Sequence, residues 1–408
     1  MSGSEGRDAR HILIVPSWYS DPDSPILGSF FRDQAEALCR RGDHVGVVYA
    51  EARSLSQLSP AAWRRSHFQT SEGDEGGVTT LRRHGWNPHV RSRVGARLWV
   101  AWTRTLMRLY AARHGVPDVV HSHSALWGGV AAGQICREWG RTHVVTEHST
   151  GFAKRYYAPW MEPYIRRTLQ GADALLAVSE SLGALIRPYA GERPIQVVPN
   201  MVDTAFFGLP AAPRPRPPRA SRRRFRFFAL ARLVPQKALD VLIRAFAAAF
   251  RGDPDAALEI GGQGEQQGSL QRLIGTENVQ HQVKLVGPLS REGVRAALHQ
   301  SDAFALGSHV ETFGVVFIEA MATGLPVVAT RCGGPEEFVT PQVGLLVAPG
   351  DAAALAGALR SVRARSRAGA YPPDQIRDHV VRRYGDAAVC GALEAVYAQA
   401  SSRGRSAA

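Results

Sequence analysis

Residues 309–330, HVETFGVVFIEAMATGLPVVAT, indicate how this chain is folded. A loop that carries Glu311 opens into a helical segment, and a Gly-Leu-Pro then leads into an apolar, β-branched run. Loops, helices and short buried strands that alternate in this way are typical of α/β proteins with a parallel sheet. The stretch also holds a second carboxylate, Glu319, inside the predicted helix and about two turns beyond Glu311. A carboxylate on either side of a helix start suggests that a ligand binds there.

The same rhythm continues in both directions along the chain. Apolar runs that suit buried parallel strands alternate with segments of helical spacing. In the N-terminal half such runs are HILIVPSWY at 11–19, HVGVVYA at 44–50, DVVHSHS at 118–124, THVVTEHS at 142–149 and IQVVPN at 195–200. In the C-terminal half they include FRFFALARL at 225–233, AALEIGGQG at 256–264, VKLVGPL at 283–289 and GLLVAPG at 344–350. The region 51–80 is less regular, and no arrangement is predicted for it.

The length of the chain and one shift in composition predict two domains. A chain of 408 residues is longer than one hydrophobic core usually supports. Residues 209–224, LPAAPRPRPPRASRRR, are rich in proline and arginine and are expected to form an extended linker. We therefore predict two α/β domains, at 1–208 and 225–375, each with a doubly wound parallel sheet, that face a cleft. Residues 376–408 are expected to form a C-terminal helix and tail that pack back towards the N-terminal domain.

The net charge of the chain and the distribution of its basic residues limit the classes of partner that it could bind. There are 49 basic and 36 acidic residues, a net charge of +13, and only Lys154, Lys237 and Lys284 are lysines. Interleaved basic and aromatic motifs are absent apart from RRRFRFF at 222–228, which runs into a strand, so we predict no nucleic-acid partner. Peripheral contact with an anionic membrane stays open. Its candidate surface is the basic set around the apolar segment 96–107, namely Arg91, Arg93, Arg97, Arg104 and Arg108. The alternative for that segment is an amphipathic core helix with a solvated basic face.

Other compositional features favour a cytoplasmic protein, or one peripheral at the inner face of the membrane. No apolar run reaches the roughly 18 residues that span a bilayer, and the N-terminus MSGSEGRDAR has no apolar core of the signal-peptide kind. The four cysteines are scattered without CxxC spacing, which indicates neither a zinc site nor a disulfide framework.

Two cations and a helix N-terminus predict a phosphate site in the C-terminal half. Arg232 and Lys237 lie just beyond a predicted strand, and ligands of open α/β sheets gather at the carboxyl ends of strands. Gly314 lies near the first turn of the helix, whose exposed N–H groups and dipole suit a diphosphate. The carboxylates of Glu311 and Glu319 are hydrogen-bond acceptors that suit sugar hydroxyls. The structural alternative is a pair of solvated cations and a pair of solvent-facing acids.

Polar side chains also end two strands of the N-terminal half. His121 and His123 lie on one face of a predicted strand, and Glu147 and His148 end the next one. We expect Glu147 and His148 to line the same site as His123, because such strand ends meet at one edge of the sheet. Two histidines at this spacing could suggest a metal, but no third ligand has suitable local spacing, so no metal site is predicted.

These features resemble the large retaining GT-B glycosyltransferase family with the Glu-x7-Glu signature (glycosyl transferases group 1, family 4-like). The resemblance rests on ARLVPQK, GGQGEQQGSLQRL, VKLVGPL, the segment from GSHVETFG to GGPEEFV, and GLLVAPGD. In addition, VVPNMVDTAFF at 197–207 is similar to the hinge segment of that family. Two positions depart from the pattern, because Ala238 and Met201 stand where the family usually has glycine. Ala238 is expected to be tolerated if it adopts ordinary helical backbone angles.

The resemblance implies roles for individual residues. It implies that Arg232 and Lys237 contact a donor diphosphate, and that Glu311 contacts the donor sugar. Glu319 would hold the ribose. His123 matches the histidine that the family places near the reacting sugar, and it would act in catalysis. Glu147 and His148 would face the acceptor. The other implied donor contacts are Gly28, Gly287, Thr312, Phe313, Gly314 and Val315.

The implied architecture is GT-B, in which two Rossmann-like domains bind the acceptor (N-terminal) and the nucleotide sugar (C-terminal). The implied reaction is retaining transfer of a hexose from a nucleoside diphosphate sugar, with a UDP-sugar favoured, to a hydroxyl of a glycan, lipid-linked or small-molecule acceptor. Surface-polysaccharide, glycolipid or natural-product biosynthesis would be its setting. Same-side attack without a metal or other cofactor is implied. The alternatives are a nucleotide-sugar epimerase of the same architecture and a non-catalytic nucleotide-sugar-binding protein.

Overall fold

The computed structural model of the 408-residue chain describes residues 9–20, 28–55, 67–211 and 224–406, with side chains up to residue 402. The chain forms two compact units, of which the first comprises residues 1–199 with 390–408 and the second comprises 200–389. The first boundary therefore lies earlier than the predicted one at 208. Most of the predicted linker, residues 212–223, lies outside the described residues.

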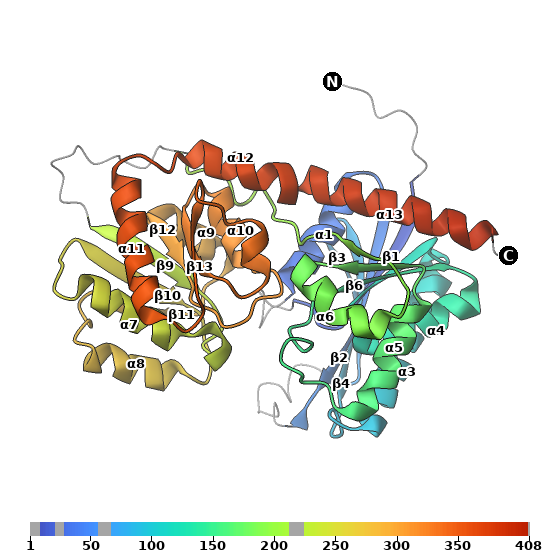
Figure 1. Ribbon diagram of the computed structural model, residues 1–408. Helices are drawn as coiled ribbons and strands as arrows, with labels where there is room; N and C mark the ends of the chain where they lie inside the picture. Colours follow the sequence, from blue (N-terminus) through green and yellow to red (C-terminus); the bar gives the residue numbers. More distant parts are fainter. Residues whose placement is uncertain (1–8, 21–27, 56–66, 212–223, 407–408) are drawn as a thin grey trace. The chain divides into compact units, whose positions relative to one another are not determined.

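The first unit has an eight-stranded sheet in the order β3-β4-β2-β1-β5-β6-β7-β8 (Figure 1). Its strands are β1 (His11–Pro16), β2 (His44–Arg53), β3 (Thr70–Glu75), β4 (Val78–Trp86), β5 (Val119–His123), β6 (Thr142–Glu147), β7 (Ala174–Ala177) and β8 (Ile195–Val197). Buried β-branched side chains such as Ile12, Ile14 and Val119 explain why these short runs form strands. The strand order reverses between β1 and β5, and ligands of open α/β sheets bind at the carboxyl ends of strands beside such a reversal.

One edge of this sheet departs from the predicted parallel arrangement. β3 pairs antiparallel with β4, whereas the other neighbouring strands of the described sheet are parallel. Gly76 and Gly77 form the turn between them, and both have a positive φ, as tight hairpin turns require. This hairpin occupies part of the region 51–80, for which the sequence pattern gave no arrangement.

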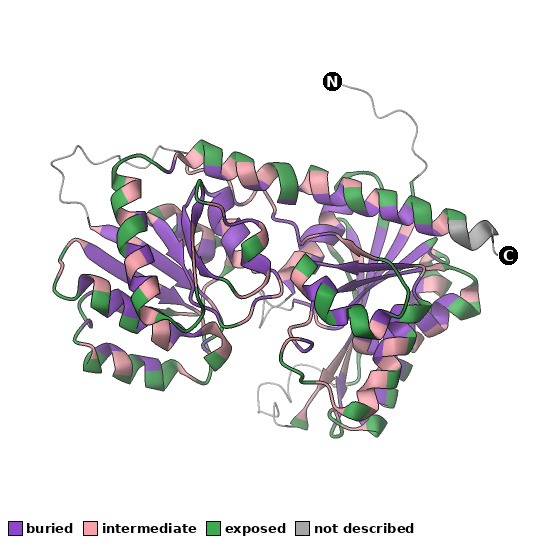
Figure 2. Ribbon diagram, in the orientation of Figure 1, coloured by how far each residue is buried: buried purple, intermediate pink, exposed green. Residues whose placement is uncertain are grey.

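Helices cover both faces of the sheet. They are α1 (Ser29–Arg40), α3 (Arg93–His114), α4 (Val130–Trp139), α5 (Glu162–Gly171) and α6 (Glu180–Ala190), with short turns η2 (Ala125–Gly129) and η3 (Pro159–Met161). α3 and α4 share a buried cluster with Leu13, Val48 and Val120 and therefore cover one face. Figure 2 shows most strands buried, apart from the exposed edge strand β3, and the outer sides of the helices exposed.

The predicted basic segment around 96–107 is part of α3, and its apolar side faces the sheet. Trp102, for example, is buried in the cluster under α3. On the outer side of α3, Arg104 and Arg108 pair with Glu138 of α4. The alternative of an amphipathic core helix therefore describes α3, and contact with anionic lipid stays a prediction. No helix of the described residues is long and apolar enough to cross a membrane.

The second unit has a six-stranded parallel sheet in the order β11-β10-β9-β12-β13-β14 (Figure 1). Its strands are β9 (Phe225–Leu230), β10 (Ala256–Gly261), β11 (Val283–Gly287), β12 (Ala303–Ala305), β13 (Val327–Thr330) and β14 (Gly344–Val347). Counted from β9, this is the 3-2-1-4-5-6 order of Rossmann folds, and it reverses between β9 and β12. The predicted doubly wound α/β class is confirmed for both units.

The C-terminal part of the chain differs from the single helix predicted near 376–400. The helices of the second unit are α7 (Leu239–Phe250), α8 (Gln267–Thr276), α9 (Arg291–Gln300), α10 (Val315–Ala322), α11 (Ala352–Arg367) and α12 (Pro373–Tyr384), with turns η4 (Pro235–Lys237) and η5 (Gly334–Glu337). Gly385 has extended backbone and separates α12 from α13 (Asp386–Ser406). A β-carbon at Gly385 would lie 2.6 Å from the carbonyl oxygen of Val381, which explains the glycine. From Cys390 onward α13 belongs to the first unit.

Candidate active site

A lysine and a glutamate form an ion pair where the strand order of the second unit reverses. Lys237 ends η4, which follows β9, and Glu311 lies in the loop after β12. Lys237 Nζ lies 2.6 Å from Glu311 Oε1, and Ser308 Oγ donates a hydrogen bond to the same oxygen at 2.8 Å. Only 7% of the Glu311 side chain is exposed, and a buried carboxylate is stable only with such partners. The structure thus brings together the predicted Lys237 and Glu311, and it adds Ser308, which lies three residues before the glutamate.

The loop after β12 turns into α10 at Gly314. Gly314 precedes the helix with φ +96°, and a β-carbon there would lie 2.9 Å from the Phe317 ring, so glycine is required. α10 begins at Val315 without a side-chain cap from Gly314, and N–H groups at such a helix start attract anions. Glu319 lies in α10, about 7.5 Å along the axis from Gly314 at 1.5 Å per residue. It is therefore about 1.4 turns from Gly314, and it is half-buried.

The other donor residues predicted in the second unit lie in loops or at element ends. Arg232 follows β9 and is exposed, and its guanidinium forms no hydrogen bond or ion pair with any described residue. Gly287 ends β11 with φ +78°. Phe313 is buried, so its main chain is the part available to a ligand. Thr312 and Val315, on either side of the Phe313–Gly314 pair, are half-buried.

The two departures from the family pattern have different outcomes. Ala238 has φ +45° and ψ +43°, so the expectation of ordinary helical angles is wrong. This left-handed residue joins η4 to α7, and for an alanine the conformation costs about 1–2 kcal/mol relative to the right-handed one. Met201 is buried and has no positive φ, and the next residue, Val202, donates its N–H to Tyr384 O at 2.8 Å. Position 201 therefore requires no glycine.

In the first unit, a buried pair of histidines lies where the strand order reverses. His123 ends β5 and His148 follows β6, and His123 Nδ1 lies 2.9 Å from His148 Nε2. Burial, together with the neighbouring imidazoles, lowers the pKa of His123 well below its usual range, so this ring is neutral. His123 Nε2 is buried and has no hydrogen-bond partner among the described residues. Buried polar atoms are rarely left unpaired, so this nitrogen is suited to bind a ligand.

Residues of α1 pack against the histidine pair. The ring centroid of Phe31 lies 4.6 Å from that of His123 and 4.9 Å from that of His148. Gly28 precedes α1 with φ +74°, and a β-carbon there would lie 3.2 Å from atoms of Phe31 and Trp18. Gly28 therefore allows a tight entry into α1, and its contact with a donor stays a prediction.

His121 supports the pair from the same face of β5. Its Nδ1 lies 2.8 Å from Tyr397 Oη of α13, and its Nε2 lies 2.7 Å from Thr146 Oγ1. Burial lowers the pKa of His121 to about 3. Both ring nitrogens of His121 are engaged in the protein, so neither is available to a ligand. His121 instead packs against His123, at a ring-centroid distance of 4.3 Å, and helps to position it. No local sequence signal reveals Tyr397, which is 276 residues away.

Glu147 ends β6 with a buried carboxylate. Its oxygens accept hydrogen bonds from the N–H groups of Ala125 at 2.8 Å, His148 at 2.9 Å and Ser149 at 2.8 Å. Burial raises the pKa of Glu147, and these N–H groups act in the opposite direction. The carboxylate therefore fixes the main chain on both sides of the histidine pair. The acceptor contacts predicted for Glu147 and His148 stay predictions.

Comparison with known proteins identifies the family. Residues 27–206 match the family Glycosyltransferase Family 4, and residues 215–367 match Glycosyl transferases group 1. Over 329 residues the chain is 32% identical to the D-inositol 3-phosphate glycosyltransferase of Salinispora arenicola, a match that covers 74% of this chain and 73% of the relative. The chain belongs to the group 1 glycosyltransferase family.

The glycosyltransferase is also similar to enzymes with other names. Over 285 residues it is 31% identical to the glycogen synthase of Mycobacterium tuberculosis. The match covers 67% of this chain and 65% of that relative, so the chain spans just under two thirds of the length of the relative. Its fold is similar to that of the sucrose-phosphate synthase of Thermosynechococcus elongatus, with a TM-score of 0.76 at 21% identity over 96% of this chain and 99% of the other. The predicted GT-B fold of this transferase is therefore confirmed.

Proposed function

We propose that this glycosyltransferase moves a hexose from a nucleoside diphosphate sugar, a UDP-sugar first among them, to an acceptor hydroxyl with retention of configuration. The observation that carries the proposal is the Lys237–Glu311 pair beside the N-terminus of α10. A cation and free helix N–H groups suit the diphosphate, and a carboxylate suits sugar hydroxyls. Arg232 would add a second cation, and Glu319 would hold the ribose.

The chemistry would rest on stabilising charge rather than on a covalent intermediate. Breaking the bond between the sugar and the diphosphate leaves negative charge on the diphosphate, which Lys237, Arg232 and the N–H groups of α10 would stabilise. A covalent route requires a free carboxylate as the nucleophile. Glu147 instead accepts three main-chain N–H groups. In same-side attack the departing diphosphate takes the proton of the acceptor hydroxyl, and His123 Nε2 would hydrogen-bond to the donor sugar.

A donor screen followed by product analysis tests the proposal. UDP-, GDP- and ADP-sugars are compared by thermal shift, because a ligand that binds only the native state raises its stability by about 2.7 kcal/mol at 100 times Kd. The anomeric configuration of the product is then read by NMR. Retention supports the proposal, and inversion overturns it. A changed nucleotide sugar formed without acceptor would indicate an epimerase, and donor binding without turnover across many acceptors would indicate a sensor.

We expect activity to persist in excess EDTA. Lys237, Arg232 and the start of α10 would supply the positive charge that a divalent metal supplies in other transferases. Within the described ranges, no group of three or more His, Cys, Asp or Glu side chains could hold a metal ion. Initial rates before and after dialysis against EDTA check this prediction. Loss of activity that Mg²⁺ or Mn²⁺ restores would contradict it.

Substitutions of Glu311 and Glu319 should affect the binding of different parts of the donor. Glu319→Gln should weaken binding of the free nucleoside diphosphate and of the intact donor by about 10- to 100-fold, because it removes one charge-assisted hydrogen bond. Glu311→Gln should not weaken binding of the nucleoside diphosphate, because it removes the carboxylate that pairs with Lys237. Turnover should fall, because Glu311 would face the sugar. Calorimetry with the diphosphate and the donor measures both effects. Equal losses of diphosphate affinity in the two variants would refute this division.

His148 should act as a positioning residue for His123. Of the two facing nitrogens one donates and the other accepts, so the tautomer of His148 fixes the tautomer of His123. His148→Phe should lower kcat by about 10- to 100-fold with little change in KM for the donor, as expected for loss of one buried hydrogen bond. His148→Gln retains an amide that donates or accepts, and it should recover part of kcat. If both variants raise KM and leave kcat unchanged, His148 binds substrate directly.

A further inference from the structure

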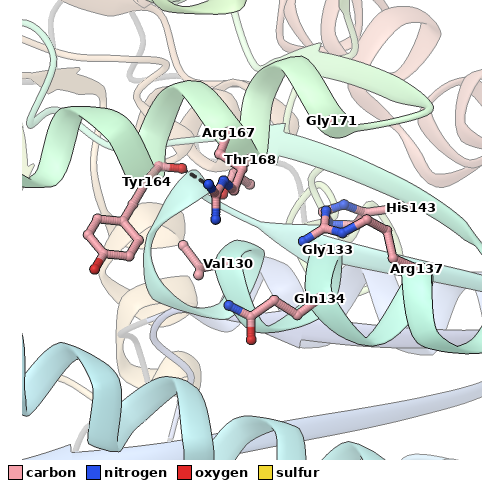
Figure 3. A pocket seen from close by; sticks show the side chains of 9 residues that line it. All are labelled: Val130, Gly133, Gln134, Arg137, His143, Tyr164, Arg167, Thr168 and Gly171. Atoms are coloured by element: carbon pink, nitrogen blue, oxygen red, sulfur yellow. Dashed lines mark hydrogen bonds between the residues drawn. The ribbon is translucent and has the colours of Figure 1, made fainter.

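A small pocket in the first unit lies between α4 and α5 and has a volume of about 30 Å³ (Figure 3). Its polar lining includes Arg137 from α4, Arg167 from α5 and His143 from β6. Two glycines leave room for it, because a β-carbon on Gly133 would lie 3.7 Å from Arg137 Nη1, and one on Gly171 would lie 3.8 Å from the same atom. No Asp or Glu lines the pocket.

Neither of the two arginines of the pocket is paired with an acid in the described part of the chain. Neither guanidinium forms a hydrogen bond or ion pair with a described residue. The one acid of α4, Glu138, pairs with Arg104 and Arg108, and the one acid of α5, Glu162, pairs with Arg166. Asp173, just beyond α5, accepts the main-chain N–H of His143 at 2.8 Å and does not line the pocket. Two cations at a concavity whose lining holds no acid attract an anion, and guanidinium groups match the geometry of phosphate and carboxylate.

A buried imidazole adds a polar group to the wall of the pocket. His143 is 2% exposed, and its Nε2 lies 2.9 Å from Ser122 Oγ. Its Nδ1 faces α4, 3.3 Å from where a β-carbon on Gly133 would lie. Ser122 Oγ also lies 3.5 Å from Val144 O, a longer and weaker contact. When the Ser122 hydroxyl donates to the nearer Nε2, the neutral ring carries its proton on Nδ1 and presents an N–H donor on the pocket side, which is the tautomer that an anion in the pocket would favour.

The pocket is separate from the histidine pair of the candidate active site. His143 is near the amino end of β6 and pairs in register with Val120, which faces α3 and α4. His123, in contrast, is at the carboxyl end of β5 and contacts Phe31 of α1. Successive side chains of a strand point to opposite faces, so Val120 and His123 lie on different faces of the sheet.

We propose that this pocket binds a single phosphate-like oxyanion, held by the Arg137 and Arg167 guanidinium groups with His143 Nδ1–H as a third donor. The volume suits this ligand class, because one water requires 10–15 Å³ on the same measure and a nucleotide would not fit. The shared chemistry is that of a phosphate group, whether free in solution or on a lipid headgroup. The site is independent of the proposed transfer reaction, so the two are tested separately.

A rival role exists for Arg137. It lies near Gly171, the last residue of α5, where a cation complements the partial negative charge of the helix end. Arg167 lies one turn earlier in α5 and has no such role. If the pocket is an anion site, replacing either arginine should weaken phosphate binding. If Arg137 only complements the helix end, replacing Arg137 should lower the stability of the protein and replacing Arg167 should have no effect.

Titration with inorganic phosphate against chloride of equal ionic strength tests the proposal, by calorimetry and by the NMR shift of the His143 ring. Binding in the millimolar range with a shift at His143 is expected. Arg137→Gln and Arg167→Gln should each weaken it at least about five-fold, as loss of a charge-assisted hydrogen bond would. Arg141→Gln is the control, because Arg141 is near the same end of β6 but pairs with Asp118.

The outcomes separate the alternatives. No shift at His143, or an equal loss of affinity in Arg141→Gln, would overturn the site in favour of diffuse charge attraction. Unchanged phosphate binding in Arg167→Gln would overturn it in favour of the helix-end role. Co-sedimentation with phosphatidic acid vesicles, compared with phosphatidylcholine alone, then identifies the source. If the protein binds the vesicles, and both substitutions and an excess of free phosphate abolish this binding, the ligand is a lipid headgroup. If the protein binds phosphate but not the vesicles, the ligand is a free anion.

Discussion

Replacing Lys237 with alanine should lower kcat/KM for the donor by about 30- to 1,000-fold and should also destabilise the second unit. The rate falls because the substitution removes a cation from the diphosphate site, worth about 2–4 kcal/mol in the transition state. Stability falls because Glu311 keeps only Ser308 as a side-chain partner for its buried carboxylate. Leaving such a group without its counter-charge costs about 2 kcal/mol.

Arg232→Ala is the matched control for that result. Arg232 is exposed and has no side-chain partner among the described residues, so its loss should reduce the rate and leave the unfolding free energy within about 0.5 kcal/mol. The double variant Lys237→Ala/Glu311→Gln should recover most of the lost stability and none of the rate, because a neutral amide requires no counter-cation. Urea unfolding and initial rates measure the two effects. Near wild-type turnover in Lys237→Ala would remove this lysine from the mechanism, and failure of the double variant to regain stability would refute the buried-charge explanation.

The ion pair also bears on how a donor would be recognised. In the structure Lys237 pairs with Glu311, so the ammonium is held at the strand ends and a ligand would bind it at little further entropic cost. A diphosphate would then compete for the ammonium, and a sugar hydroxyl would compete for the carboxylate. A ligand that carries both groups satisfies both partners, whereas free phosphate leaves Glu311 less well paired. This coupling would favour an intact nucleotide sugar over phosphate alone.

The sequence pattern predicted the parts of the site that depend on strand ends. Arg232, Lys237 and Glu311 each follow a buried apolar run, and parallel strands bring their carboxyl ends to one edge. Contacts distant in sequence could not be predicted, because Tyr397 meets His121 across 276 residues and no periodicity encodes that pairing. The left-handed conformation of Ala238 could not be predicted, because glycine is the residue that indicates a positive φ and the sequence has alanine at this position. The β3–β4 hairpin did have a signal, the Gly76–Gly77 turn, within a stretch too polar to indicate a strand.

Lowering the pH from 7 to 5 should destabilise the first unit by at least about 4 kcal/mol. Burial lowers the pKa of His11 to about 4 and the pKa of His123 well below its usual range, so these two rings add to the effect. Burial lowers the pKa of His121 to about 3, and burial with the charge of Arg137 lowers the pKa of His143 to about 3. Both rings therefore stay neutral in the folded state at pH 5, while the unfolded chain protonates them below about 6.5. The unfolded state then binds more protons, so stability is fully present above pH 6.5 and is lost as pH falls towards 3. Each ring contributes about 2 kcal/mol over the 1.5 pH units between 6.5 and 5. The raised pKa of Glu147 acts in the opposite direction, because the folded state then takes up a proton more readily as pH falls.

Tryptophan fluorescence during urea unfolding measures this effect in the first unit alone, because all eight tryptophans lie between Trp18 and Trp160. The slope of the unfolding free energy against pH between 6.5 and 5 should correspond to at least about two protons. His143→Gln keeps a hydrogen-bonding amide for Ser122 and should reduce that slope by about one proton. His89→Gln, which removes an exposed imidazole, is the control and should leave it unchanged. A flat profile in the wild-type chain would mean that these rings accept protons in the folded state, and the neutral histidine pair on which the role of His123 depends would then be wrong as well.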